Sequence, residues 1–274
     1  MKRQASIAVA IFLVALSGEV AAAPRAELWP MWEQSDESNT AEIDHSAWQG
    51  FLDRYLDTQS GDGVYLVRYG AVSVTDRQTL DTYITDLQAS DPRDYSKAEQ
   101  KAYWINLYNA ATVQLVLDHP TKKSILQMNK GLFSFFGPWD EPLLNIAGEE
   151  VTLNDIEHRI LRPIWQDHRI HFAVSCASLS CPNLEEQAYT SDDTDTLLDQ
   201  NERAYINHPR GVSFDDKGRL TVSNIFKWYG DDFADDEQQL LEYFASHADE
   251  PLASQLRAYD GRLSYDYDWD LNGT

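Results

Sequence analysis

Sulfur and positive charge are both scarce in this sequence. Its 274 residues include two cysteines and three methionines, and 22 Lys and Arg residues stand against 45 Asp and Glu residues, for a formal net charge of −23. Such an excess of negative charge repels phosphate backbones and anionic lipid headgroups. The sequence contains no cluster of basic residues that would offset this negative charge locally. The composition therefore argues against nucleic acid as a partner.

Several motifs that would define a chemistry are missing as well. We find no glycine-rich phosphate loop, no G-x-S-x-G nucleophile elbow and no C-x-x-C pair. The acidic residues Asp231, Asp232, Asp235 and Asp236 lack the spacing of a calcium loop, and we expect them to be solvated surface charges. The sequence accordingly predicts no cofactor.

Long apolar runs are limited to the amino terminus. Residues 1–22 combine basic Lys2 and Arg3, an apolar stretch at 7–16 and small residues at 20–22, which is the pattern of a bacterial secretory signal peptide. The apolar stretch is short for a spanning helix. We therefore expect cleavage after Ala22, a periplasmic or secreted protein and no integral membrane segment after cleavage. An uncleaved membrane anchor is the alternative.

The rest of the chain predicts a helix-rich α+β protein. Residues 23–44 are polar and aperiodic, and we interpret them as an N-terminal arm before a single globular domain at 45–274. A capping box at Ser96 and Glu99 opens a helix that is apolar all the way round, so we expect this helix to be central and buried. A hairpin at 212–222 and alternating apolar residues at 263–269 predict a small, mainly antiparallel sheet.

Both cysteines fall in one stretch, RIHFAVSCASLSCPNLEEQAY at 169–189. Residues 170–175 have the composition of a buried strand, which would place Cys176 at its carboxyl end. Pro182 suits the first helical position, which would make Cys181 an N-cap with a lowered thiol pKa. Because an exported protein meets an oxidising compartment, a structural disulfide between the two cysteines is a separate hypothesis.

The long predicted helix carries two amides, Asn106 and Asn109, three residues apart among apolar neighbours. Buried amides need hydrogen-bond partners, because each unpartnered group costs about 1–3 kcal/mol. Two interpretations follow. The amides tie loop backbone to the helix, or they serve a site by orienting a histidine or donating to an oxyanion.

A second predicted helix, LNDIEHRILRPIW at 153–165, carries a carboxylate toward the core. At about 100° per residue, Glu157 falls on the buried side and His158 on the rim. A buried carboxylate must be paired or have a raised pKa. Glu157 therefore either pairs with Arg162 or Arg169 or takes a catalytic or histidine-orienting role.

Five ordered motifs together resemble one family. They are YWINLYNA at 103–110, TVQLVLDHP at 112–120, LNDIEHRILR at 153–162, RIHFAVSCASLSCPNL at 169–184 and SNIFKWYGDDF at 223–233. They are similar to the domain of unknown function 547 family in its bacterial exported form, over about residues 95–233. The resemblance implies no reaction or ligand. The residues at its signature positions are Asn106, Tyr108, Asn109, Glu157, His158, His171, Cys176, Cys181 and Pro182.

Several functions remain open on these residues. A thiol-dependent hydrolase or acyl transferase would take its nucleophile from Cys176 or Cys181, its base from His158 or His171, and an orienting group from Asn109 or Glu157. The alternative is a non-catalytic cell-envelope binding or scaffold protein, with a protein or peptide partner and a Cys176–Cys181 disulfide. Two further hypotheses are a redox pair and a zinc site formed by the two cysteines with His158 and His171.

Overall fold

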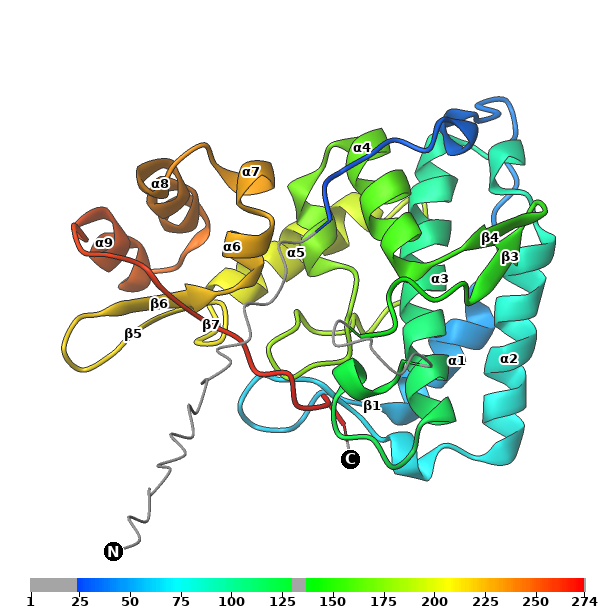
Figure 1. Ribbon diagram of the computed structural model, residues 1–274, viewed down its shortest axis with the longest axis horizontal. Helices are drawn as coiled ribbons and strands as arrows, with labels where there is room; N and C mark the ends of the chain where they lie inside the picture. The colour runs from blue at the N-terminus through cyan, green and yellow to red at the C-terminus, as the bar shows by residue number, and fades with distance from the viewer. Residues whose placement is uncertain (1–23, 130–136, 274) are drawn as a thin grey trace, which may run out of the picture.

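Helices dominate the computed structural model, which describes residues 24–129 and 137–273 (Figure 1). The predicted signal peptide lies outside the described residues. The long helix α3 (Lys97–Asp118) runs beside α2 (Val74–Ala89) and α1 (Ser46–Tyr55). The remaining helices are α4 (Arg162–Trp165), α5 (Thr194–Ile206), α6 (Ile225–Trp228), α7 (Gly230–Phe233), α8 (Glu237–His247), α9 (Leu252–Arg257) and the π-helix η5 (Asp155–Leu161). Short 3-10 turns are η1 (Pro30–Glu33), η2 (Tyr69–Ala71), η3 (Pro92–Asp94), η4 (Ile125–Gln127) and η6 (His168–Phe172).

The expectation for the long helix is confirmed. Ser96 accepts a hydrogen bond from the Glu99 amide, which satisfies one of the free N–H groups at the helix start. The side chains from Glu99 to Val113 are all buried, on every side of the helix. Helix α3 is therefore a central core element that two other helices and the cysteine loop can pack against.

The strands form three small sheets. The hairpin of β5 (Val212–Phe214) and β6 (Leu220–Ser223) is antiparallel as predicted, and β7 (Ser264–Asp266) pairs with β6 in parallel. Two further antiparallel pairs join β1 (Leu56–Asp57) to β2 (Leu66–Val67) and β3 (Leu144–Ile146) to β4 (Glu149–Val151). The chain is thus a helix-rich α+β protein with small, mainly antiparallel sheets.

Two apolar clusters account for most of the core. The larger surrounds α3 and includes Trp104 and Ile170, and the second is built around Phe172, Phe226 and Phe244 beneath α6 and α8. Ile170 and Phe172 belong to the same short turn, η6, so this turn spans the boundary between the clusters. The interpretation of residues 45–274 as one domain stays a prediction.

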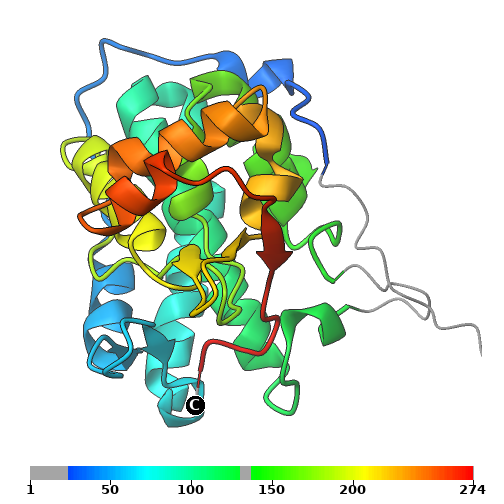
Figure 2. The ribbon, with the colours of Figure 1, turned by 90° about the vertical axis from the view of Figure 1, so that its left-hand side faces the viewer.

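The C-terminal tail crosses the molecule as an extended segment, from the region of α9 toward β1 (Figures 1 and 2). Its backbone pairs with the cysteine loop, because Leu179 N–H donates to Asp270 O at 2.8 Å and Asn272 N–H donates to Ala177 O at 3.0 Å. At Gly273 a Cβ atom would lie 2.3 Å from the Tyr69 ring, so only glycine fits this close approach. We name residues 267–273 the C-terminal strap.

The longest described helix is the 22-residue α3. Neither it nor any other helix within residues 24–129 and 137–273 has the length and apolarity required to cross a bilayer.

Two local predictions for the cysteine region are wrong. Residues 170–175 do not form a strand: Asp167 accepts from the Arg169 amide and starts the 3-10 turn η6 instead. No helix begins at Pro182, because Cys181 N–H turns back to Ser178 O and the following residues are irregular. In both segments, side chains from elsewhere in the fold supply backbone hydrogen bonds that a strand or a helix would otherwise provide.

Candidate functional site

The backbone before Cys176 is held by one amide side chain of α3. Asn109 donates to Ala173 O at 2.9 Å and accepts from Ser175 N–H at 2.8 Å. Its carboxamide is thereby occupied, so it does not orient a histidine. The interpretation of Asn109 as a tie between helix and loop backbone is confirmed, and the residue fixes the position of the chain immediately before the cysteine.

Asn106 makes the same pair of contacts to a different loop. It donates to Tyr189 O at 2.7 Å and accepts from Tyr189 N–H at 3.0 Å. Both amides are fully buried. Two asparagines of α3 therefore each bind one loop through the same pair of hydrogen bonds. Only the loop that Asn109 binds carries a cysteine thiol.

A strained turn brings the two cysteines together. Ala177 has φ of 58°, in the left-handed region that non-glycine residues seldom adopt. The turn allows the Cys176 N–H to donate to Cys181 Sγ at 2.9 Å. Both residues are free thiols, so the disulfide of the scaffold hypothesis is not formed in this structure. Cys176 is half-buried and Cys181 is buried.

Polar groups converge on the Cys176 sulfur. Ser178 Oγ lies 3.2 Å and Tyr267 Oη lies 3.1 Å from Cys176 Sγ, and the Cys181 thiol also interacts with it. Burial raises the pKa of Cys176, but hydrogen bonds from Cys181, Ser178 and Tyr267 outweigh burial and lower the pKa to about 7. Burial raises the pKa of Cys181 well above its usual value. When one of the two thiols is ionised, the negative charge therefore lies on Cys176.

The histidine half of the site centres on His171. Its Nδ1 lies 3.2 Å from Glu157 Oε1 and its Nε2 lies 2.7 Å from Asp232 Oδ2. Both ring nitrogens therefore face a carboxylate oxygen, which accepts a hydrogen bond from whichever nitrogen carries hydrogen. The ring stacks on Tyr229 with centroids 4.0 Å apart. His171 is thus clamped between two carboxylates with an aromatic ring over its face.

Arginine and histidine charges stabilise both carboxylates in their ionised forms. Arg162 binds Asp232 through two hydrogen bonds, of 2.7 Å and 2.9 Å. Burial would raise the pKa of Asp232, but His171 and Arg162 hold it well below its usual range. Burial also raises the pKa of Glu157, and the charges and hydrogen bonding of His158 and His171 outweigh this and lower it to about 2. The prediction that Asp232 is a solvated charge is wrong.

The position of Glu157 and His158 follows from an unusual helix. Residues Asp155–Leu161 form a π-helix, and the Arg162 N–H bonds to Glu157 O in the i to i+5 pattern. The wider turn buries both neighbouring side chains, Glu157 at 6% and His158 at 2% exposure. The prediction of His158 on the rim is wrong, because the count of 100° per residue holds only for an α-helix. Short π-helices occur frequently at functional sites.

The N-terminal arm covers this π-helix. The backbone N–H groups of Glu27 and Trp29 donate to His158 O at 3.0 Å and Arg159 O at 2.9 Å. The Arg159 guanidinium lies 4.4 Å from the centre of the Trp29 ring. The arm thus supplies a donor for His158 O, which Arg162 N–H would bond in an α-helix, and for Arg159 O, whose α-helical partner Pro163 has no N–H; it thereby stabilises the π geometry.

His158 lies beside the Arg162 guanidinium. Arg162 Nη1 lies 3.1 Å from His158 Nδ1, a contact that disfavours a proton on that nitrogen. Burial, together with the nearby Arg162 charge, lowers the pKa of His158, although Glu157 opposes this. The two histidines of the site therefore have different neighbours, since His158 faces a guanidinium and His171 faces two carboxylates.

Tyr229 connects the histidine half to the cysteine half. Burial raises the pKa of Tyr229 well above its usual value, and the charges of Glu157 and Cys176 both add to this rise. Tyr108 on α3 is likewise influenced by Glu157 and Cys176. Among the described residues no histidine nitrogen is within hydrogen-bonding distance of either sulfur. The described residues therefore do not form the direct contact that the hypothesis of a cysteine–histidine dyad expects.

A metal centre is not supported by this arrangement. Within the described part of the chain, no group of three or more His, Cys, Asp and Glu side chains is placed to hold a metal ion. The zinc hypothesis required the two cysteines and both histidines to converge. Their hydrogen bonds instead divide them into two separate groups, one around Cys176 and one around His171.

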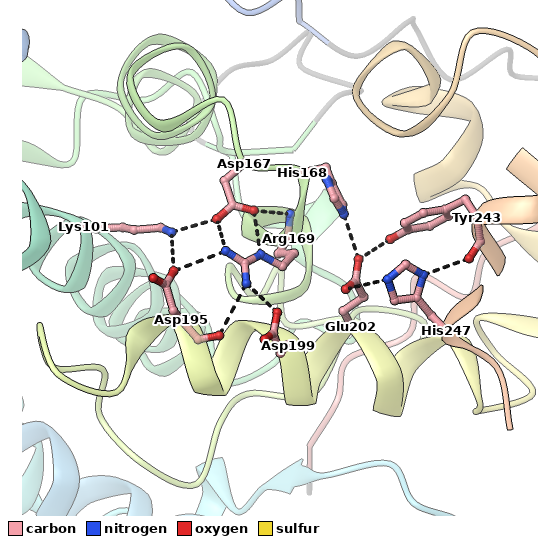
Figure 3. Close-up of polar contacts among 9 residues, drawn as sticks. All are labelled: Lys101, Asp167, His168, Arg169, Asp195, Asp199, Glu202, Tyr243 and His247. Atoms are coloured by element: carbon pink, nitrogen blue, oxygen red, sulfur yellow. Dashed lines mark hydrogen bonds and ion pairs between the residues drawn. The ribbon is translucent and has the colours of Figure 1, made fainter. Parts of the chain in front are cut away.

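The turn that carries His171 is fixed by an ionic network (Figure 3). Asp167 accepts from Lys101 of α3 at 2.8 Å, and Arg169 contacts both Asp167 and Asp199 of α5. Neither arginine proposed for Glu157 forms an ion pair with it, since Arg169 binds these acids and Arg162 binds Asp232. That part of the prediction is wrong, and Glu157 contacts His171 instead.

The same figure shows a second group beside the first. Glu202 of α5 accepts from His168 at 2.8 Å and from Tyr243 at 2.5 Å, and His247 lies 3.3 Å away. Burial raises the pKa of Glu202, and its hydrogen bonds to His168 and Tyr243 outweigh this and lower it. These contacts attach η6 to α5 and α8, so His171 sits on a turn anchored from three helices.

The structure adds four site residues that were not selected from the sequence. Ser178 and Tyr267 contact the Cys176 sulfur, and Tyr229 and Asp232 contact His171. Tyr229 and Asp232 lie inside the motif SNIFKWYGDDF, so the resemblance at this motif could have pointed to them as site residues. The alternating aromatic pattern at 263–269 indicates a strand, but nothing in it points to a thiol.

Comparison with known proteins gives one match. Residues 92–206 match the model of a family described as protein of unknown function, DUF547. No curated protein and no solved structure matches the chain. The matched segment contains Asn109, the Glu157–His158 pair, His171 and both cysteines, whereas Tyr229, Asp232 and Tyr267 lie beyond it. Residues 92–206 of the chain are therefore similar to the DUF547 family.

Proposed function

We propose that this protein is a thiol-dependent enzyme of the hydrolase or acyl-transferase class, with Cys176 as the nucleophile. The observation that carries the proposal is the convergence of Ser178, Tyr267 and Cys181 on the Cys176 sulfur. A thiolate is the reactive form of cysteine, and hydrogen-bond donors favour it. The signal-peptide pattern supports action in the periplasm or outside the cell.

The geometry favours Cys176 over Cys181 as the attacking group. Cys181 is only 3% exposed, its pKa is raised, and it accepts from the Cys176 amide. Cys176 is half-buried and follows directly on the backbone that Asn109 fixes. The strained Ala177 after it is a further mark of a functional turn, because strain of this kind gathers at active sites.

We assign Tyr229 as the proton donor for acyl chemistry, because the charge of Cys176 influences its phenol and its ring stacks on His171. When the thiolate attacks an acyl carbon, negative charge develops on the carbonyl oxygen and must be stabilised by a donor. The high pKa of Tyr229 keeps its phenol protonated, and His171 and Glu157 position it. His171 is accordingly a positioning residue. A base that acts directly on the sulfur is not needed when the thiolate is already formed.

The scaffold alternative draws on the predicted export of the chain and on a structural disulfide between the two cysteines. Because both cysteines are free thiols in the structure, the second of these supports is missing. A non-catalytic binding role would not explain why several hydrogen-bond donors converge on the Cys176 sulfur. We therefore assign the enzyme function.

Alkylation and acylation of the full chain test the proposed nucleophile. We expect iodoacetamide to label Cys176 with a rate that reaches half its maximum near pH 7, whereas an ordinary thiol does so near about pH 8.5. An acyl donor such as p-nitrophenyl acetate should leave one acetyl group on Cys176, detected by intact mass and peptide mapping.

Two variants complete this experiment. Cys176→Ser should abolish both adducts. Adding Ser254→Cys, at an exposed position of α9, to the Cys176→Ser protein gives a reference thiol with ordinary pH dependence. An alkylation midpoint that coincides with that of the reference thiol, together with no acetyl adduct, would exclude the proposed function.

The tail tyrosine should contribute to the reactivity of Cys176. In Tyr267→Phe the sulfur loses one donor, and a hydrogen bond to a charged group is worth about 1.5–3 kcal/mol. We expect the alkylation midpoint to rise by about one pH unit, measured from the pH dependence of the iodoacetamide rate. Tyr265→Phe, two residues earlier on β7, is the matched control and should leave the midpoint in place. Equal midpoints in both variants would show that Tyr267 does not support the thiolate.

A further inference from the structure

We propose that Cys176 and Cys181 also act as a peroxide-reducing pair, in which Cys176 attacks a small hydroperoxide and Cys181 resolves the product as an intramolecular disulfide. The observation is that both cysteines are free thiols and that the Cys176 N–H donates to the Cys181 sulfur at 2.9 Å across the turn at Ala177. The inference shares the nucleophile with the proposed function, and it does not depend on acyl transfer.

Each step of the reaction balances. The Cys176 thiolate attacks the terminal oxygen of the hydroperoxide, the O–O bond breaks, and the leaving oxygen takes a proton to become an alcohol or water. Cys176 becomes a sulfenic acid. The Cys181 sulfur then attacks the Cys176 sulfur, the S–OH bond breaks, and the hydroxyl leaves as water with the Cys181 proton. An external dithiol restores both thiols by exchange.

The surroundings of Cys176 suit the first step. The Ser178 and Tyr267 hydroxyls both lie near 3 Å from the sulfur, at 3.2 Å and 3.1 Å, and they also contact each other at 3.0 Å. A hydroperoxide oxygen that approaches the sulfur meets these donors, which can hydrogen-bond the oxygen that leaves. The same hydroxyl groups that stabilise the thiolate therefore also donate hydrogen bonds to the departing alkoxide or hydroxide.

The size of the substrate follows from the packing over the sulfur. The C-terminal strap lies on the cysteine loop, with Leu179 and Ser180 N–H groups bonded to Asp270 and Asp268 carbonyls. Tyr267 packs against Trp228 and Trp269 beside the half-buried Cys176. Attack on a disulfide of another protein requires in-line access to a bulky sulfur atom. A small hydroperoxide needs far less room, and we assign that class.

Cys181 is positioned for the second step, its attack on the Cys176 sulfenic acid. Its sulfur accepts from the Cys176 amide at 2.9 Å, and its thiol interacts with the Cys176 sulfur. Its high pKa keeps it a thiol until the sulfenic acid forms, so it brings the proton that the departing hydroxyl requires. Since it is buried beside its partner, Cys181 is shielded from oxidation by bulk reagents.

Mass spectrometry of the full chain with hydrogen peroxide or cumene hydroperoxide tests the pair. We expect loss of two hydrogens, a Cys176–Cys181 disulfide in the peptide map, and reversal by dithiothreitol. Cys181→Ser should stop at a sulfenic acid that dimedone traps on Cys176. Oxidation of Cys176 by hydrogen peroxide should exceed that of the reference thiol in the Cys176→Ser, Ser254→Cys protein by at least about tenfold.

The outcomes separate this inference from the proposed function. Rapid alkylation at neutral pH without disulfide or dimedone adduct would overturn the peroxide activity and leave the nucleophile standing. Rapid disulfide formation without an acetyl adduct would support the peroxide activity and remove acyl transfer. Oxidation of Cys176 no faster than that of the reference thiol would overturn the inference.

Discussion

Replacing Asn109 with alanine should both destabilise the protein and slow the alkylation of Cys176. The substitution leaves Ala173 O and Ser175 N–H without partners in the core, and each buried unpartnered group costs about 1–3 kcal/mol. We expect the free energy of unfolding to fall by about 2–5 kcal/mol in urea denaturation. Because the backbone before Cys176 then moves, the sulfur leaves its donors and its alkylation rate at pH 7 should fall several-fold.

Asn106 offers a control for this experiment within the same helix. Asn106→Ala removes an equivalent pair of hydrogen bonds, to Tyr189, and should cost a similar free energy of unfolding. Its loop carries no cysteine, so the pH midpoint of Cys176 alkylation should stay unchanged. Asn109→Asp keeps the acceptor for Ser175 N–H and serves if the alanine variant does not fold. Equal effects of the two alanine variants on alkylation would show that Asn109 only stabilises the core.

Substitution of Glu157 by glutamine should remove much of the acid sensitivity of the fold. The pKa of Glu157 is about 2 in the folded protein against the usual 4.5, so its ionised form stabilises the fold above about pH 4.5. This contribution is lost as the pH falls from about 4.5 to about 2. A shift of this size corresponds to about 3 kcal/mol. We expect urea denaturation of Glu157→Gln to show a lower stability at pH 7 and a shallower loss below pH 4.5.

Glu150→Gln is the matched control for the acid series. Glu150 is exposed on the short strand β4, close in sequence but away from the histidines. Its substitution should leave the dependence of stability on pH like that of the wild type. If Glu157→Gln retained the full acid slope, the ionised carboxylate at position 157 would not be the group that His158 and His171 stabilise.

The sequence predicts elements whose determinants are local. Helix α3 was recognisable because its capping box and its unbroken apolar surface both lie within the helix. The stretch 170–175 has an equally apolar composition, yet it is not a strand, because Asn109 provides backbone hydrogen bonds from a distant helix. A local pattern cannot report a partner that is more than sixty residues away in the chain.

The candidate site likewise contains some residues that could be predicted from local sequence and others that could not. Glu157, His171 and the two cysteines could be selected from motifs, and the structure brings Glu157 to His171 and Cys176 to Cys181. The side of the helix that His158 occupies could not be predicted, because it depends on a π-helix that the N-terminal arm stabilises. Tyr267 reaches the sulfur across 91 residues, and only the folded topology places it there.

The C-terminal strap also has a consequence for biosynthesis. A nascent chain on the ribosome that has been translated through α9 contains both cysteines but lacks Tyr267 and the backbone groups of 268–272 that bind the cysteine loop. Its Cys176 consequently has fewer donors and resembles an ordinary thiol, with a pKa of about 8.5. We therefore expect the low thiol pKa of Cys176 to be complete only after residues 267–272 have docked on the cysteine loop.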